Sequence, residues 1–84
     1  MATEEEFQAA VTRSRTISKT PSNQQLLELY SLFKQASVGD VQGKRPGAFK
    51  LKDRAKYDAW AGQKGKSQDA ARTEYIALVD SLAS

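Results

Sequence analysis

Apolar residues recur along the chain with helical spacing, and no segment alternates with the period of two that a half-buried strand requires. Near the start, Thr3 and Glu6 form a capping-box pattern that opens an amphipathic segment. Its apolar face consists of Phe7, Ala10, Val11, Ser14 and Ile17. The pattern predicts a first helix that begins at Thr3 and ends near Ser18, before the break at Pro21.

A second capping box, Ser22 with Gln25, opens a predicted helix over residues 22–37, and Gly39 is a typical C-terminal stop. The expected apolar stripe consists of Leu26, Leu27, Tyr30, Phe33 and Ala36. Residues 38–50 then hold three of the five glycines and one of the two prolines, which predicts a long loop. A loop of this length is often functional, because ordering it costs backbone entropy.

Two more helices are expected after the loop. The third should run from Leu51 to Gln63 and direct Ala55, Ala59 and Trp60 inward. The fourth begins after the cap Ser67, which Asp69 supports near the positive end of the helix dipole.

The fourth helix has the clearest amphipathic pattern of the chain, formed by Ala71, Tyr75, Leu78 and Leu82. Trp60, Phe33 and Phe49 are expected in the core. Four helices without a strand predict an all-α bundle, in a single domain over residues 1–84, with a long connection between the second and third helices.

Composition excludes most kinds of catalysis. The chain has no Cys and no His, so thiolate chemistry, thiolate metal sites, the usual zinc ligand and the commonest general base are all absent. We therefore expect no catalytic residues and no metal site. No apolar run reaches the roughly 18 residues of a membrane span, and the polar, acidic start MATEEEF is unlike a signal peptide. A cytoplasmic location is expected.

Positive charge is concentrated in one part of the chain, although the net charge is only +3. The segment from 44 to 66 holds two acids, Asp53 and Asp58, and eight basic residues: Lys44, Arg45, Lys50, Lys52, Arg54, Lys56, Lys64 and Lys66. A basic surface of this kind fits a phosphate-bearing partner. A solvated, lysine-rich helix face is the alternative that charge alone leaves open.

Two pairs at i, i+4 spacing could form a binding site for such a partner. Tyr30 and Lys34 share a face of the second helix, and Lys52 and Lys56 share a face of the third. A ring can stack on a nucleobase, and ammonium groups bind phosphate. Equally, Tyr30 could be a core aromatic and the lysines ordinary surface residues. Tyr75 is open to both interpretations, as a packed residue or a ligand contact.

The segment from Tyr30 to Ile76 resembles the acyl-CoA-binding protein family. The most recognisable element is YSLFKQASVGD (residues 30–40), and RPG, KYDAW, KG and YI follow at the spacing of the family. The resemblance covers nearly the whole chain. It implies an up-down-down-up four-helix bundle that binds long-chain acyl-CoA without changing it chemically, and thus no cofactor.

The resemblance also implies roles for particular residues. Tyr30 is expected to stack on or near the adenine, and Lys34 to contact the 3′-phosphate of the ribose. Lys56 should be the second phosphate contact, with Lys52 in support, while Tyr75 closes the headgroup site. The remaining expected contacts are Arg15 from the first helix, and Ser31, Leu32 and Phe33 along the second.

The acyl chain of such a ligand should lie in an apolar groove. Burial contributes roughly 0.8 kcal/mol per methylene, or on the order of 12 kcal/mol for about fifteen, before ordering costs are counted. Phe7, Ala10, Leu26 and Leu27 are the side chains expected near it. The resulting expectation is a monomeric intracellular carrier and pool former for acyl-CoA, with no nucleic-acid partner, no stable membrane insertion and at most transient contact with membranes or acyl-CoA enzymes.

Two other classes of protein are weighed against this one. GKRPGAF followed by a lysine-rich helix with Trp60 superficially resembles a high-mobility-group box, a small basic nucleic-acid-binding module. A net charge of +3 argues against it, because such boxes recruit phosphates over a long, more basic surface. A thioesterase is disfavoured because the chain has no His, no Cys and no nucleophile elbow.

Overall fold

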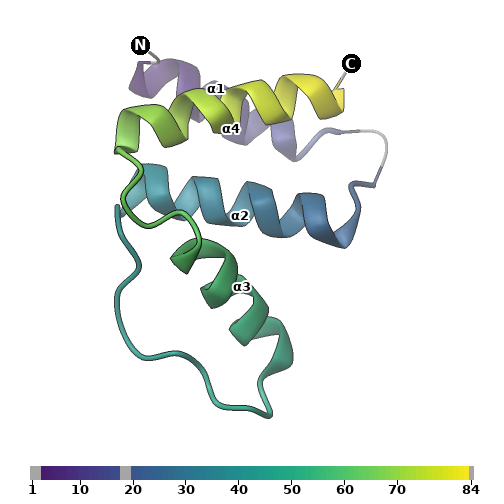
Figure 1. Ribbon diagram of the computed structural model, residues 1–84. Helices are drawn as coiled ribbons and strands as arrows, with labels where there is room; N and C mark the ends of the chain where they lie inside the picture. The colour runs from purple at the N-terminus through teal and green to yellow at the C-terminus, as the bar shows by residue number, and fades with distance from the viewer. Residues whose placement is uncertain (1–2, 18–19, 84) are drawn as a thin grey trace.

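The computed structural model describes residues 3–17 and 20–83, which form four helices and, within those ranges, no strand. The helices are α1 (Glu4–Ser14), α2 (Asn23–Ser37), α3 (Leu51–Ala61) and α4 (Gln68–Ala83). They form an up-down-down-up bundle: α1 and α4 run in one direction and α2 and α3 in the other (Figure 1). Both the predicted all-α class and the predicted arrangement are confirmed.

Local capping signals define the starts of α1, α2 and α4, whereas α3 begins without a side-chain cap. Thr3 and Ser22 each form the expected capping box with the residue three positions on. The Ser67 hydroxyl accepts a hydrogen bond from the Ala70 N–H at 3.0 Å, as a cap for α4 should. Gly39 ends α2 with a φ of +93°, a left-handed conformation that favours glycine.

Two helix ends come earlier than expected. The described part of α1 ends at Ser14, so Ile17 follows the helix rather than extending its face, and the predicted end near Ser18 lies outside the described residues. α3 ends at Ala61 instead of Gln63, because the chain continues as turns through residues 62–65.

The core is centred on α2, which packs against both α3 and α4, whereas α1 packs against α4. Its buried residues are Phe7, Ala10, Leu29, Leu32, Ala36, Ala71, Tyr75 and Val79. The buried face of α2 therefore passes through Leu29, Leu32 and Ala36. The stripe expected from the sequence was wrong in part, because Leu26 is 46% exposed.

The three aromatic side chains expected in the core have different environments. Trp60 is buried, as predicted, and Phe33 is partly buried against the core. Phe49 is fully exposed, so its predicted place in the core was wrong. It lies at the turn where the loop meets α3, beyond the reach of the helices that form the core.

The long connection between α2 and α3 follows from their parallel directions. α2 ends at one side of the molecule, and α3 begins at the other (Figure 1). The loop therefore has to pass along the length of α3, about 16 Å for eleven residues. Over the described residues, no helix is long and apolar enough to cross a membrane.

Candidate functional site

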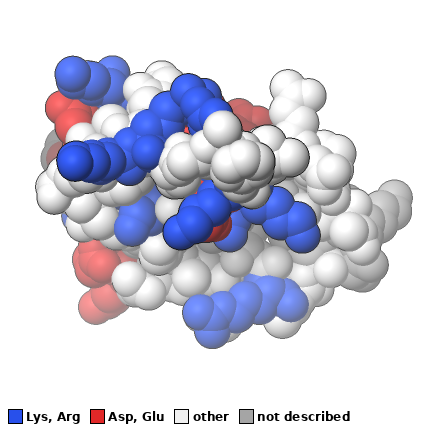
Figure 2. Space-filling view, turned by 90° about the horizontal axis from the view of Figure 1, so that it is seen from below, with Lys and Arg blue, Asp and Glu red and all other residues white. Residues whose placement is uncertain are grey.

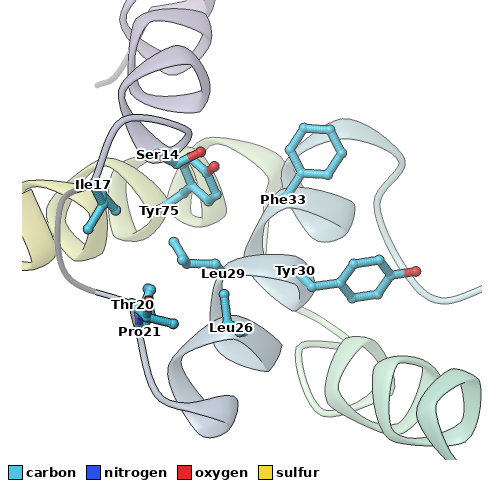
Figure 3. A pocket seen from close by; sticks show the side chains of 9 residues that line it. All are labelled: Ser14, Ile17, Thr20, Pro21, Leu26, Leu29, Tyr30, Phe33 and Tyr75. Carbon is cyan, nitrogen blue, oxygen red and sulfur yellow. The ribbon is translucent and has the colours of Figure 1, made fainter.

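Three adjoining surface hollows lie on the α2 side of the bundle. The first, which we call the aromatic hollow, has a volume of about 420 Å³. It is lined by Ser14, Ile17, Thr20, Pro21, Leu26, Leu29, Tyr30, Phe33 and Tyr75. Figure 3 shows that its rings come from α2 and α4, and that Tyr30 extends outward from α2, away from the aliphatic side chains. Flat ring surfaces of this kind can stack on a planar ligand.

The second hollow, the lysine hollow, lies between α2, α3 and the long loop and has a volume of about 350 Å³. Its lining residues are Tyr30, Pro46, Lys50, Asp53, Lys56, Tyr57 and Trp60. Two ammonium groups against one carboxylate give it a positive balance. Such a hollow suits a phosphate group, for which lysine provides a point charge.

The third hollow, the aliphatic hollow, has a volume of about 430 Å³ and lies between α2 and α3. It is lined by Asn23, Leu26, Leu27, Leu51, Lys52, Ala55 and Lys56. Its surface is mainly hydrocarbon, with two lysines whose stems can cover apolar groups while their ammonium groups stay in water. It offers the chemistry that an alkyl chain requires.

Shared residues connect the three hollows. Tyr30 lines both the aromatic and the lysine hollow, Leu26 the aromatic and the aliphatic, and Lys56 the lysine and the aliphatic. Each pair of hollows thus has a residue in common. A single extended ligand could therefore place a ring, phosphates and an alkyl chain in neighbouring hollows.

The two cation–ring pairs bring α2 and α3 together at the junction of these hollows. The Lys56 Nζ lies 5.5 Å from the centre of the Tyr30 ring, and the Lys34 Nζ lies 4.9 Å from the centre of the Trp60 ring. Each lysine faces an aromatic residue of the opposite helix, at a distance typical of cation–π contacts. The i, i+4 faces identified in the sequence do meet.

Hydrogen bonds from α3 fix the long loop beside the lysine hollow. The Trp60 Nε1–H donates to the Gly39 carbonyl oxygen at 2.8 Å, and the Tyr57 hydroxyl donates to the Gly43 carbonyl oxygen at 3.0 Å. Further along, Arg45 binds the carboxylate of Asp58 with its Nε at 2.8 Å and its Nη2 at 2.7 Å. Pro46 and Lys50 are consequently held at the hollow.

The Arg45–Asp58 pair also shifts the ionisation of both groups. The hydrogen bonds from Arg45 lower the pKa of the Asp58 carboxyl below its ordinary value of 3.8. The same contact raises the pKa of Arg45. Both side chains are about half exposed, so this pair orients the loop more than it stabilises the fold.

Asp40 connects the end of α2 to the turn before α4. Its Oδ1 accepts hydrogen bonds from the Gly65 N–H at 2.9 Å and from the Gln35 Nε2 at 2.9 Å. Gln35 is buried and also donates to the Lys66 carbonyl oxygen at 2.7 Å. The Gly65 N–H, followed by Gln35, lowers the pKa of Asp40 below 3.8, because both donors favour the charged carboxylate.

The predicted site residues fall into two groups. Tyr30, Phe33, Lys52, Lys56 and Tyr75 all line one or more of the three hollows. Lys34 lies beside them over Trp60.

The other three predicted residues lie elsewhere. Ser31 and Leu32 are buried, at 1% and 2% exposure, and line none of the three hollows. The Ser31 hydroxyl donates to the Glu28 carbonyl oxygen and accepts from the Gln63 Nε2, so it links α2 to the turn after α3. Arg15 is exposed at the C-cap of α1, next to Ser14 of the aromatic hollow, but does not line that hollow.

Several lining residues were not identified from the sequence. Pro46, Lys50 and Tyr57 line the lysine hollow, and Leu51 and Ala55 line the aliphatic one. Lys50 and Tyr57 could have been assigned to the site from the sequence, because each lies within two turns of Lys56 in a basic, aromatic stretch. Across the described ranges, no group of acidic side chains gathers in a way that could hold a metal ion.

Comparison with known proteins finds matches over most of the chain. Residues 4–79 match the family model described as acyl CoA binding protein. The chain is 50% identical over 78 residues to the acyl-CoA-binding protein homolog of Drosophila melanogaster, covering 93% of this chain and 91% of that protein. It is 60% identical over 62 residues to the acyl-CoA-binding protein of Saccharomyces cerevisiae, covering 74% and 71%.

The fold is also that of a solved relative. The crystal structure of Oryza sativa acyl-CoA-binding protein 2 matches with a TM-score of 0.91 at 47% identity, over 94% of this chain and 88% of that one. The alternative of a nucleic-acid-binding module receives no support from these similarities.

Proposed function

The chain belongs to the acyl-CoA-binding protein family, and from this membership and the three hollows we propose that it binds long-chain acyl-CoA esters without catalysis. The observation that carries the proposal is the junction of an aromatic, a lysine-lined and an aliphatic hollow. An acyl-CoA ester combines a purine, several phosphates and an alkyl chain in one molecule. It needs all three kinds of surface side by side.

In the proposed complex, the adenine stacks in the aromatic hollow against Tyr30 and Phe33, with Tyr75 at its inner wall. Lys34 and Lys56 reach the phosphates from α2 and α3, and Lys52 supports them from one turn earlier in α3. Arg15 adds a cation from the end of α1. Ser31 and Leu32 keep this face of α2 in place from beneath.

The acyl chain is proposed to lie in the aliphatic hollow, against Leu26, Leu27 and Ala55. Phe7 and Ala10, once expected near it, are 2% and 0% exposed and belong to the core. The chain gains affinity as its methylenes leave water, at roughly 0.8 kcal/mol each. A protein that binds headgroup and chain together, without a catalytic group, serves as an intracellular carrier and pool former, with a cytoplasmic monomer as the proposed form.

Calorimetric titration with palmitoyl-CoA, free CoA and palmitate tests the proposal. We expect palmitoyl-CoA to bind much more tightly than either part. Four buried methylenes alone correspond to about 3 kcal/mol, or roughly a hundredfold in Kd over free CoA. Palmitoyl-CoA that binds no better than free palmitate would refute the proposal.

A matched pair of variants locates the headgroup. Lys56→Ala removes a cation at the junction of the lysine and aliphatic hollows, whereas Lys44→Ala removes an exposed cation that lines none of the three. We expect the first to weaken palmitoyl-CoA binding and the second to leave it nearly unchanged. Equal losses in both variants would show that general positive charge, rather than this site, binds the phosphates.

A further inference from the structure

An unusual apolar surface lies outside the proposed headgroup site. Phe49 is fully exposed and Leu51 is 74% exposed, the two largest exposures among large apolar side chains in the described part of the chain. They alternate with Lys50 and Lys52 in the sequence AFKLK, residues 48–52, which we call the docking segment. Apolar side chains without a covering partner commonly mark an interaction surface.

The docking segment forms a projecting corner rather than a cleft. Figure 1 shows the chain turning at the lower edge of the molecule, where the loop meets α3. Phe49, Lys50, Leu51 and Lys52 all surround one surface depression together with Asp53. Apolar and lysine side chains at such a corner can enter a lipid headgroup layer together, because such a layer needs no matching cavity to receive them.

The charge around the segment is strongly positive. Residues 44–56 contain six basic side chains and a single acid, Asp53, although the whole chain carries only +3. Asp58, the next acid, pairs with Arg45 at 2.7 Å, which leaves five basic side chains against Asp53 in this stretch. Figure 2 views the molecule from this side and shows several patches of Lys and Arg side chains, with acidic side chains over a smaller area.

We propose that the docking segment binds reversibly to the surface of an anionic lipid bilayer. Phe49 and Leu51 enter the headgroup layer, where aromatic and aliphatic side chains leave water. Lys50 and Lys52 meet the lipid phosphates, and the exposed Lys44 and Lys56 add to the long-range attraction. An anionic bilayer fits better than an acidic protein, because Phe49 and Leu51 are exposed next to lysines at a corner of the molecule and can enter a lipid headgroup layer without a partner surface shaped to receive them.

Docking would also place the aliphatic hollow near the membrane. Leu51 and Lys52 belong both to the docking segment and to the lining of that hollow. An acyl chain could therefore pass between the hollow and the lipid layer over a short path. This link rests on the proposed function, whereas membrane docking itself does not.

Vesicle co-sedimentation of the full chain tests docking. We expect binding to vesicles with about 30% phosphatidylglycerol, little binding to pure phosphatidylcholine, and loss of binding as salt rises from about 0.05 to about 0.5 M. Phe49→Ser should reduce the partition by about tenfold. Val38→Ser, at an exposed apolar residue of the α2 C-cap, is the control and should change little.

A fluorescent variant provides an independent readout. In Phe49→Trp, the added indole should shift its emission to shorter wavelength with anionic vesicles, while the parent chain, with Trp60 alone, should show no such shift. No binding to anionic vesicles at low salt, or full binding by Phe49→Ser, would overturn the proposal. Tighter binding to polyglutamate than to vesicles, insensitive to Phe49, would overturn it in favour of an acidic protein partner.

Palmitoyl-CoA calorimetry on the same variants separates the two proposals. Phe49 lines none of the three hollows, so Phe49→Ser should keep the affinity for palmitoyl-CoA. Vesicle binding without palmitoyl-CoA binding would refute the proposed function and leave docking intact. Palmitoyl-CoA binding without vesicle binding would refute membrane docking and leave the proposed function intact.

Discussion

The α1–α4 half of the molecule and the α3 side are held together in different ways. α1 and α4 share a closed apolar interface, in which Phe7, Ala10 and Val79 are almost fully buried. α3 packs against α2 alone and buries Trp60 as its only residue below a tenth exposure. On the α3 side, where little apolar surface is buried, hydrogen bonds to the loop and the cation–ring contacts add to the attachment of α3.

This difference explains where a ligand could bind. A closed interface leaves no room for a ligand without a large loss of packing. Between α2 and α3, by contrast, hollows remain beside a contact that buries Trp60 and includes the two cation–ring pairs. Most of the buried core therefore lies between α1, α2 and α4, and two of the three hollows lie beside α3.

The largest effect is expected from a cavity in the closed half. Phe7→Ala removes a buried ring that contacts both Tyr75, at 5.3 Å between ring centres, and Phe33, at 6.0 Å. We expect the free energy of unfolding to fall by about 3–5 kcal/mol. Urea titration followed by circular dichroism measures it. A loss below about 1 kcal/mol would contradict the assignment of the core to this half.

Next in size is the effect of removing both cations from the open side. The double variant Lys34→Ala and Lys56→Ala should lose roughly 2–5 kcal/mol of palmitoyl-CoA binding, since each charge-assisted contact is worth about 1.5–3 kcal/mol and losses overlap. Calorimetry measures the loss. Helicity should stay nearly the same, because neither side chain belongs to the buried core. A collapse of the circular dichroism signal would instead make these lysines structural.

A smaller effect should follow from releasing the loop. Trp60→Phe keeps an aromatic ring under Lys34 but removes the hydrogen bond from Nε1–H to the Gly39 carbonyl. We expect a loss of about 1–2 kcal/mol in stability and faster amide hydrogen exchange in residues 39–46. Hydrogen exchange followed by mass spectrometry checks the location. Unchanged exchange in that segment would show that the other loop contacts suffice.

The smallest effect concerns pH. The pKa of Asp40 is lowered in the folded chain by the Gly65 N–H and by Gln35, so its contribution is present above 3.8 and is lost as pH falls through the lower folded value. Thermal unfolding between about pH 6 and pH 2 should show part of the acid destabilisation disappear in Asp40→Asn. An identical pH profile for variant and parent would contradict this role.

Sequence reasoning succeeded where the signal was local. Both capping boxes depend on residues three positions apart, and the facing pairs on α2 and α3 follow from i, i+4 spacing. The helix order and the contacts of Tyr30 with Lys56 agree with those predictions. The family resemblance then supplied the ligand class, which spacing alone left open.

The predictions that were wrong concern which apolar side chains are buried, and burial depends on tertiary packing. α2 has apolar residues around most of its circumference, so spacing could not decide between the face of Leu26 and that of Leu29. In the folded chain Leu29 belongs to the buried core cluster, whereas Leu26 does not. Phe49 was expected inside because it is apolar, yet its position at a loop corner leaves it in water. The loop contacts of Trp60 and Tyr57 join residues too distant in sequence to be foreseen.

The central claim is that one ligand spans the three hollows, touches α1 and α4 only where their ends and Tyr75 border the aromatic hollow, and leaves the buried α1–α4 interface intact. Amide chemical-shift mapping with free CoA and with palmitoyl-CoA tests it most directly. Free CoA should perturb the amides of Tyr30, Lys34 and Lys56, and palmitoyl-CoA should perturb Leu27 and Ala55 in addition. Shifts centred on the α1–α4 interface, or identical maps for the two ligands, would contradict the claim.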